Sequence, residues 1–210
     1  MRNLMIASVI LVAAWGCDTA KAPPPAAAPA SSTAPSKNAS ATAADSDADA
    51  EPVKPAGEAS EVALAIKDYD GIVELIKSHQ GKVVVVDCWS TWCEPCMKEF
   101  PGLVALHEKH GPDKVACISL SLDYEGLPNK TPEDDADKVL KFLRSQRAAF
   151  DNVLSSTPAD ELSKLLEFPS PPTVFVYDQE GELSRMFPGP EAKYEPKIAP
   201  LVEQLLEEEE

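Results

Sequence analysis

The chain has 210 residues, and its 35 acidic residues outnumber 19 lysines and arginines to give a net charge of -16 at pH 7. This charge argues against nucleic acid or an anionic surface as a partner. A hydrophobic content of 44% supports one core, and the length leaves room for one ordinary domain with additional segments. No stretch reaches the roughly 18 apolar residues of a membrane-spanning helix.

An export signal is predicted at the N-terminus. Arg2 precedes an apolar run over residues 4–14, which has the length of a signal h-region. Gly16 and Cys17 follow, and this pattern resembles a bacterial lipoprotein signal, in which cleavage before the cysteine exposes it for lipidation. We therefore expect residues 1–16 to be a lipoprotein signal peptide and Cys17 to carry a lipid anchor. The alternative is an ordinary secretory signal in which Cys17 has no role.

Residues 17–60 are predicted to form a disordered linker ahead of a domain at 61–210. The segment consists mainly of Ala, Pro, Ser, Thr and Asp, a composition that cannot bury enough apolar surface to offset chain entropy. As a coil it would reach on the order of 40 Å, which suits a domain held away from a membrane. A passive leader has the same composition.

The domain alternates predicted strands and helices, in the order typical of an α/β fold with parallel strands and right-handed crossovers. β-Branched and apolar runs predict the strands 61–66, 83–88, 115–122, 150–154, 173–177 and 182–187. Helical spacing of apolar residues predicts the helices 68–78, 96–109, 134–147, 158–167 and 196–206. Asp70 is the expected N-cap of the first helix, and Pro101 is expected to kink the second.

A Cys-x-x-Cys pair, Cys93 and Cys96, lies between the buried strand 83–88 and the next helix. The amide groups and dipole of a helix N-terminus favour the thiolate that attacks disulfides, and Pro95 suits a first helical turn. Cys93 comes first and is expected to be the exposed nucleophile, with Cys96 resolving the mixed disulfide. The pair is half a zinc site, but no second pair follows, so we expect neither a metal nor a cofactor.

Three acidic residues lie close to the cysteine pair in the sequence. Asp87 ends the buried strand and can accept a proton from Cys96, or it can act as a cap. Glu99, one helical turn after Cys96, can titrate near the thiols, or it can be a favourable first-turn acid. Glu94 lies between the cysteines, where its charge is expected to oppose thiolate formation and favour reducing behaviour.

These residues resemble the thioredoxin fold. The resemblance is carried by Asp87, by the segment 92–96 that contains the dithiol, and by Pro172 with Thr173. The segment 99–101 narrows it to membrane-anchored, extracytoplasmic thiol-disulfide oxidoreductases of the TlpA type, including the reductases of cytochrome c maturation. The implied architecture is a thioredoxin-like fold, a central mixed sheet flanked by helices, with a helix-strand insertion at 136–154.

The resemblance also implies roles for single residues. Pro172 would be a cis-proline facing the disulfide, although the residues alone permit a plain loop there. Glu99 would match the family's active-site glutamate. The lysine that thioredoxin places near its buried aspartate is absent, and Ser119 or Cys117 occupies that place. The expected substrate-contacting residues are Trp92, Pro95, Pro171 and Pro172.

The two remaining cysteines fall in predicted core strands. Cys88 and Cys117 should lie on neighbouring strands, where they could form a structural disulfide. We expect them instead to be buried reduced thiols.

The functional hypothesis is a monomeric thiol-disulfide oxidoreductase of the cell envelope that reduces protein disulfides. Its expected partners are disulfide-bearing client proteins and an unidentified membrane electron donor, because the compartment is oxidising and the chain has no donor domain. One alternative is an oxidase or isomerase of protein disulfides. Another is a tethered module that binds copper or a partner protein through the two thiols without turnover.

Overall fold

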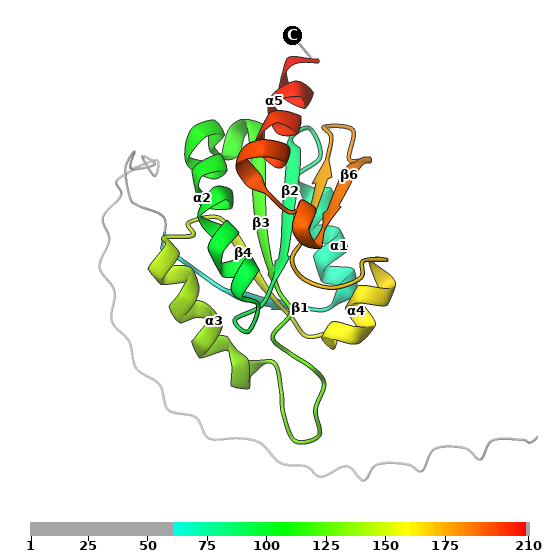
Figure 1. Cartoon of the computed structure of the whole chain (residues 1–210). Coiled ribbons are helices and arrows are strands. Elements are labelled where there is room, and N and C mark those ends of the chain that lie inside the picture. Colours follow the sequence, from blue (N-terminus) through cyan, green and yellow to red (C-terminus); the bar gives the residue numbers. More distant parts are fainter. Residues whose placement is uncertain (1–60, 209–210) are drawn as a thin grey trace, which may run out of the picture. The chain divides into compact units, whose positions relative to one another are not determined.

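The computed structural model describes residues 61–208 of the chain. The predicted signal peptide, Cys17 and the linker lie outside the described residues. Within 61–208, strands and helices alternate around one six-stranded sheet (Figure 1). None of the helices in this part of the chain is long and apolar enough to cross a membrane.

The sheet is mixed, as the fold class predicts. Its strands lie in the order β1-β4-β3-β2-β5-β6, in which β1, β4, β3 and β2 run parallel, β5 runs antiparallel to β2, and β6 runs antiparallel to β5. β4 lies between β1 and β3, so the expected inserted strand widens the sheet from within. The strands are β1 (Ala65–Lys67), β2 (Val83–Trp89), β3 (Val115–Ser121), β4 (Asp151–Ser155), β5 (Thr173–Tyr177) and β6 (Leu183–Pro188).

Strands β2 and β3 form the centre of the core. Every residue of both strands is buried, which explains why their sequences are apolar runs without alternation. Side chains still alternate between the two faces: Val83 and Val85 belong to one hydrophobic cluster, whereas Val84 and Val86 belong to the other. Asp87, two residues after Val85, therefore projects towards the first of these faces.

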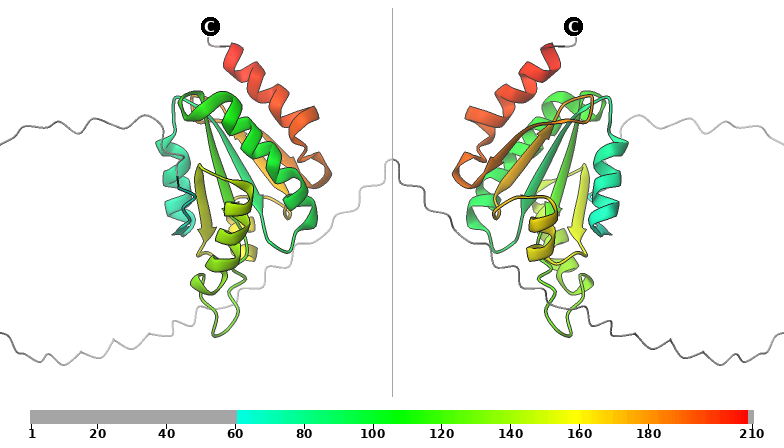
Figure 2. Two further views of the ribbon diagram at one scale, coloured as in Figure 1. Left: turned by 90° about the vertical axis from the view of Figure 1, so that its left-hand side faces the viewer. Right: turned by 90° about the vertical axis from the view of Figure 1, so that its right-hand side faces the viewer.

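Helices cover both faces of the sheet. Apolar residues of α2, α3 and α5 pack on the face of Val83 and Val85, and those of α1 and α4 pack on the opposite face. Figure 2 shows α1 on one side of the sheet and α2 with α5 on the other. The helices are α1 (Tyr69–Ser78), α2 (Glu94–Lys114), α3 (Glu133–Gln146), α4 (Ala159–Leu165) and α5 (Ala199–Glu207).

Two details of the helix predictions were wrong. Asp68, not Asp70, caps α1, because its carboxylate accepts a hydrogen bond from the Gly71 amide at 2.9 Å. Helix α2 begins two residues earlier than expected and ends at Lys114, not at Lys109. Its backbone leaves helical dihedral angles at Gly111, a break that the sequence did not predict, and the kink at Pro101 stays a prediction. Glycine tolerates the positive φ of 64° at that break.

The segment before α5 is irregular and is important for the site. The chain passes through a short 3₁₀ turn, η1 (Gly189–Glu191), and then a π-helical turn, η2 (Tyr194–Ile198). The predicted helix 196–206 therefore begins as a π-helical turn and becomes α-helical only at Ala199. η2 packs against α2 and turns Tyr194 into the core.

Candidate functional site

Cys93 and Cys96 form a disulfide, with their sulfur atoms 2.01 Å apart, at the turn from β2 into α2. The turn lies at the carboxyl end of the central strand (Figure 1). Cys93 is the N-cap of α2, and Pro95 occupies the first helical turn, where its missing N–H leaves no hydrogen bond unmade. The sequence predicted this placement of the two cysteines.

The backbone favours a thiolate at Cys93. The amide of Cys96 donates a hydrogen bond to the Cys93 sulfur over 3.3 Å, and the free amides of the helix N-terminus add a positive potential. Cys93 is 6% exposed and Cys96 is 2% exposed. Both cysteines are thus buried in the disulfide form, whereas the sequence predicted an exposed Cys93. Cys93 is the slightly more exposed residue of the two, and the order of attack stays a prediction.

Asp87 is a buried carboxyl group on the α2 side of the sheet. It lies on the same face of the sheet as Cys93 and Cys96, and Tyr194 donates a hydrogen bond to its Oδ2 at 2.8 Å. Burial raises the pKa of Asp87 to about 7; the Tyr194 hydrogen bond opposes this rise, and the charge of Glu99 adds to it. A carboxyl group with this pKa can both release and accept a proton near neutral pH.

The other two acidic residues are paired with lysines. Lys193 lies 2.6 Å from the Glu99 carboxylate, and Lys98 lies 2.8 Å from that of Glu94. The Lys98 hydrogen bond lowers the pKa of Glu94, and both side chains of that pair are exposed. The sequence suggested that Glu94 presents an unopposed charge to the dithiol, but Lys98 compensates this charge. The influence of Glu94 on the redox couple is reduced accordingly.

The Pro171–Pro172 peptide bond is cis. Thr173 pairs with Cys88 in the antiparallel register of β5 with β2, so Pro172 lies at the same end of the sheet as the dithiol. A cavity of about 380 Å³ is lined by both Trp92 and Pro171, and the Trp92 side chain is 57% exposed beside it.

All four expected substrate-contacting residues, Trp92, Pro95, Pro171 and Pro172, thus lie at this end. Pro95 is exposed on the first turn of α2. The catalytic roles of Asp87, Glu99 and Pro172 stay predictions.

The sequence did not reveal the group that holds the active-site loop. Asp123, buried just after β3, accepts hydrogen bonds from the amide of Thr91 at 3.0 Å, from the Thr91 hydroxyl, and from Ser121 at 2.7 Å. Lys138 of the inserted helix α3 lies 3.1 Å from the same carboxylate. Thr91 immediately precedes Trp92 and Cys93, so this network fixes the approach to the dithiol. A carboxylate directly after a buried strand was the only signal for it.

The sequence also missed Lys193 and Tyr194. These consecutive residues contact Glu99 and Asp87, and the contact between Tyr194 and Asp87 joins residues 107 positions apart. No local pattern marks them.

The remaining two cysteines are reduced and buried, as expected. Cys117 pairs in register with Val85, three residues from Cys88, so the two thiols lie on opposite faces of the sheet and cannot bond. Burial raises the pKa of both thiols, and Asp87 adds to the rise. They are therefore neutral and stay outside the exchange chemistry.

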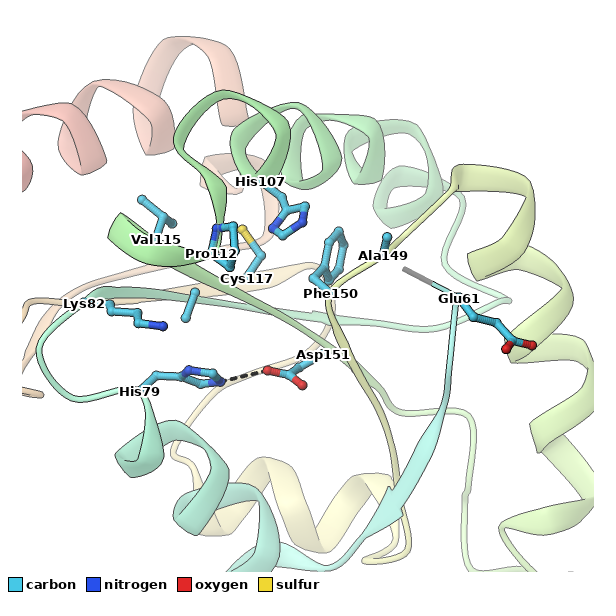
Figure 3. A pocket seen from close by; sticks show the side chains of 11 residues that line it. Glu61, His79, Lys82, His107, Pro112, Val115, Cys117, Ala149, Phe150 and Asp151 are labelled. Carbon is cyan, nitrogen blue, oxygen red and sulfur yellow. Dashed lines mark hydrogen bonds and ion pairs between the residues drawn. The ribbon is translucent and has the colours of Figure 1, made fainter. Parts of the chain in front are cut away.

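A second cavity, of about 530 Å³, lies where β2, β3 and β4 begin, at the end of the sheet opposite the dithiol (Figure 3). His79 lies 2.8 Å from Asp151 at its wall, and His107 and Phe150 point into it from the other side (Figure 3). In residues 61–208 no three His, Cys, Asp or Glu side chains are arranged to hold a metal ion.

Together, a mixed sheet, a disulfide at the N-cap of the helix after the central strand, and a cis-proline at the same end define a thioredoxin-like redox protein. The chain belongs to the AhpC/TSA family, whose model matches residues 56–186.

Two relatives are named as thiol-disulfide oxidoreductases. The chain is 27% identical over 112 residues to Sporulation thiol-disulfide oxidoreductase A of Bacillus subtilis (strain 168), a match that covers 53% of this chain and 62% of that protein. It is 29% identical over 140 residues to Thiol-disulfide oxidoreductase ResA of Bacillus thuringiensis subsp. konkukian (strain 97-27), covering 64% and 74%. With the bonded Cys93–Cys96 pair, these names confirm the expected enzyme class.

A solved structure agrees with the fold. The thioredoxin-like superfamily protein SPOA0173 superposes with a TM-score of 0.50 at 20% identity, over 62% of this chain and 84% of that one. The likeness supports the architecture alone.

Replacing Asp87 with Asn should stabilise the protein increasingly as the pH rises. Between about pH 4 and pH 7 the Asp87 carboxyl is ionised in the unfolded chain but still protonated in the folded protein, where its pKa is about 7 instead of 3.8, so stability is lost over this range. The gain in unfolding free energy from Asp87→Asn should therefore grow by about 2 to 3 kcal/mol between pH 5 and pH 8. Urea unfolding of the oxidised protein at both pH values measures it.

Asp137→Asn, which removes an exposed charge in the middle of α3, serves as the control. Its effect should stay within about 0.5 kcal/mol at both pH values. A pH-independent effect of Asp87→Asn would show that the buried carboxyl is not strained by ionisation.

Proposed function

We propose that the chain reduces disulfide bonds of client proteins in the cell envelope by dithiol exchange through Cys93 and Cys96. The observation that carries the proposal is the position of the pair. Cys93 caps α2 and its sulfur accepts a hydrogen bond from a backbone amide, while Asp87 is buried near the end of β2, on the face of the sheet that α2 covers. One accessible nucleophile, one shielded resolving thiol and one proton acceptor are what dithiol exchange requires.

The exchange proceeds in two steps. The Cys93 thiolate attacks one sulfur of the client disulfide, and the client's other sulfur leaves as a thiolate, so that a mixed disulfide forms. Asp87 then accepts the proton of Cys96, whose thiolate attacks the Cys93 sulfur and expels the second client thiolate. Two electrons pass from the dithiol to the client, and the protein is left with the disulfide seen in the structure.

A reducing direction is supported by the charges around the dithiol. Lys98 and Lys193 are each engaged by a glutamate, so neither lysine offers a free positive charge to the sulfurs. Ionisation of the buried Asp87 makes a second anion nearby unfavourable. Reduced thiols that are costly to ionise give up their electrons more readily than stabilised thiolates do.

The proposed location follows from the sequence. A signal peptide at 1–16, a lipid anchor on Cys17 and a linker at 17–60 would hold the domain outside the cytoplasm, as in the TlpA type. Each turnover leaves the dithiol oxidised, so the proposal includes a membrane protein that returns two electrons. Cytochrome c maturation is one process that needs such a reductase.

The rival function is a tethered module that holds copper or a protein partner through the two thiols. It predicts stoichiometric metal in protein purified under reducing conditions and no turnover of disulfides.

The protein should accelerate the reduction of insulin disulfides by dithiothreitol. Replacing Cys93 with Ser should abolish this acceleration, because the attacking thiol is lost. Turbidity from the precipitating insulin B chain measures the rate. Cys117→Ala, which removes a buried thiol on β3, should retain activity within about twofold where the variant is folded. Undiminished activity of Cys93→Ser would overturn the proposed function.

The reduction potential of the pair tests the direction. Equilibration with a glutathione or dithiothreitol buffer, followed by trapping of free thiols, should give a value near that of a reductase, roughly -270 mV for thioredoxin. A value near -120 mV, typical of a strong envelope oxidant, would favour the oxidase alternative.

A further inference from the structure

Tyr194 is the one side chain hydrogen-bonded to the Asp87 carboxyl group among the described residues. Its hydroxyl donates to Asp87 Oδ2 at 2.8 Å, and the two side chains are only 3% and 2% exposed. Tyr194 opens the π-helical turn η2, far from the dithiol in sequence. The contact therefore connects the C-terminal part of the fold directly to Asp87, the expected proton acceptor of Cys96.

Helix α2 is shaped to admit the Tyr194 ring. At Gly102 a Cβ atom would lie 2.4 Å from both Cβ and Cγ of Tyr194, a distance that side chains do not tolerate. Glycine costs about 1 kcal/mol relative to alanine in a helix interior. Its place here allows the ring to lie against α2 while the hydroxyl reaches Asp87.

The other titratable groups around Asp87 do not replace this contact. On α2, Glu99 raises the pKa of Asp87, and Lys193 pairs with Glu99 at 2.6 Å. Cys88, next to Asp87 on β2, and Cys117, on the neighbouring strand β3, are thiols whose pKa values burial raises. The pKa of the Tyr194 hydroxyl is also raised, first by burial, so it stays protonated and can only donate to the carboxylate.

We propose that Tyr194 is a positioning residue of the exchange reaction, whose hydroxyl holds the ionised Asp87 carboxylate ready to receive the proton of Cys96. The inference rests on the proposed dithiol exchange and adds a residue to it. Tyr194 stabilises the Asp87 carboxylate through a hydrogen bond, without adding a positive charge. The carboxylate therefore stays basic enough to accept a proton near neutral pH. Lys193, the preceding residue, supports the same state by compensating Glu99.

The test isolates closure of the disulfide by Cys96. The reduced full-length chain, carrying Cys17→Ser, is mixed with Ellman's reagent in a stopped-flow instrument. Attack by Cys93 releases one thionitrobenzoate and forms a mixed disulfide; attack by Cys96 on Cys93 then releases a second and restores the Cys93–Cys96 bond. The rate of the second release should rise with pH, with a midpoint near that of Asp87.

Tyr194→Phe keeps the ring and removes the hydrogen bond. The midpoint should move up by about one pH unit, the size expected for one hydrogen bond to a charged group. At pH 7 the second release should slow by about fivefold, and at pH 9 it should match that of the parent chain, because Asp87 is then ionised in both. An unchanged midpoint would overturn the inference.

Two further comparisons exclude a merely structural effect. In an Asp87→Asn background, Tyr194→Phe should change nothing, because its effect runs through the carboxyl group; a persisting effect would contradict the proposal. Tyr177→Phe is the matched control, since Tyr177 belongs to the cluster on the opposite face of the sheet. An equal midpoint shift in that variant would also contradict it.

The Lys193→Met variant provides independent support. The uncompensated Glu99 charge should move the midpoint upward even though the Tyr194 hydrogen bond is retained. Closure by Cys96 does not depend on any client protein. If the chain fails to reduce insulin while the closure rates behave as described, the proposed function fails and the inference about Tyr194 stands.

Discussion

The structure depends on one unfavourable interaction, the burial of the Asp87 carboxyl group on the face of the sheet that also holds the Cys93–Cys96 pair. A carboxylate out of water is costly unless other groups compensate it, and here burial raises its pKa to about 7. The fold accepts this cost at a position where the proposed exchange reaction moves a proton. The only hydrogen bond to this carboxyl among the described residues comes from Tyr194, which is held in place by the turn before α5.

Helix α2 connects the parts of the site. Its N-terminus holds Cys93 as a cap and offers an amide to its sulfur, and its third turn provides Gly102, against which Tyr194 packs. On the other side of the dithiol, Asp123 anchors the preceding loop through Thr91 and takes Lys138 from the inserted helix. The insertion and the C-terminal turn thus both act on the same few residues around the cysteine pair.

Much of this arrangement could be predicted because it is local. The β-branched run before Asp87 and the Cys-x-x-Cys spacing are each visible within a few residues, whereas the cis-proline was implied only by the resemblance to the thioredoxin fold. The observed strand and helix boundaries differ from the predicted ones by only a few residues. Hydrophobic periodicity shows that a helix or strand exists more reliably than it shows where that element ends. The choice of Asp68 over Asp70 as cap turned on a single side-chain hydrogen bond.

What could not be predicted depends on packing between distant segments. Nothing near Tyr194 in the sequence shows that a π-helical turn will direct it to a strand 107 residues earlier. The Glu94 charge is compensated because the Lys98 side chain adopts a rotamer that brings it to the Glu94 carboxylate. The sequence permits this rotamer but does not require it. Such contacts decide the electrostatics of the site, and they follow only from the assembled fold.

The most direct test is the titration of the Asp87 carboxyl itself, followed by carbon-13 NMR of the oxidised protein, with Asp87→Asn to assign the resonance. A strained, buried proton acceptor should titrate with a midpoint near 7, as its burial and its hydrogen bond to Tyr194 require. A midpoint near 4 would mean that the carboxyl is solvated or fully compensated, and would contradict its role as the proton acceptor of Cys96.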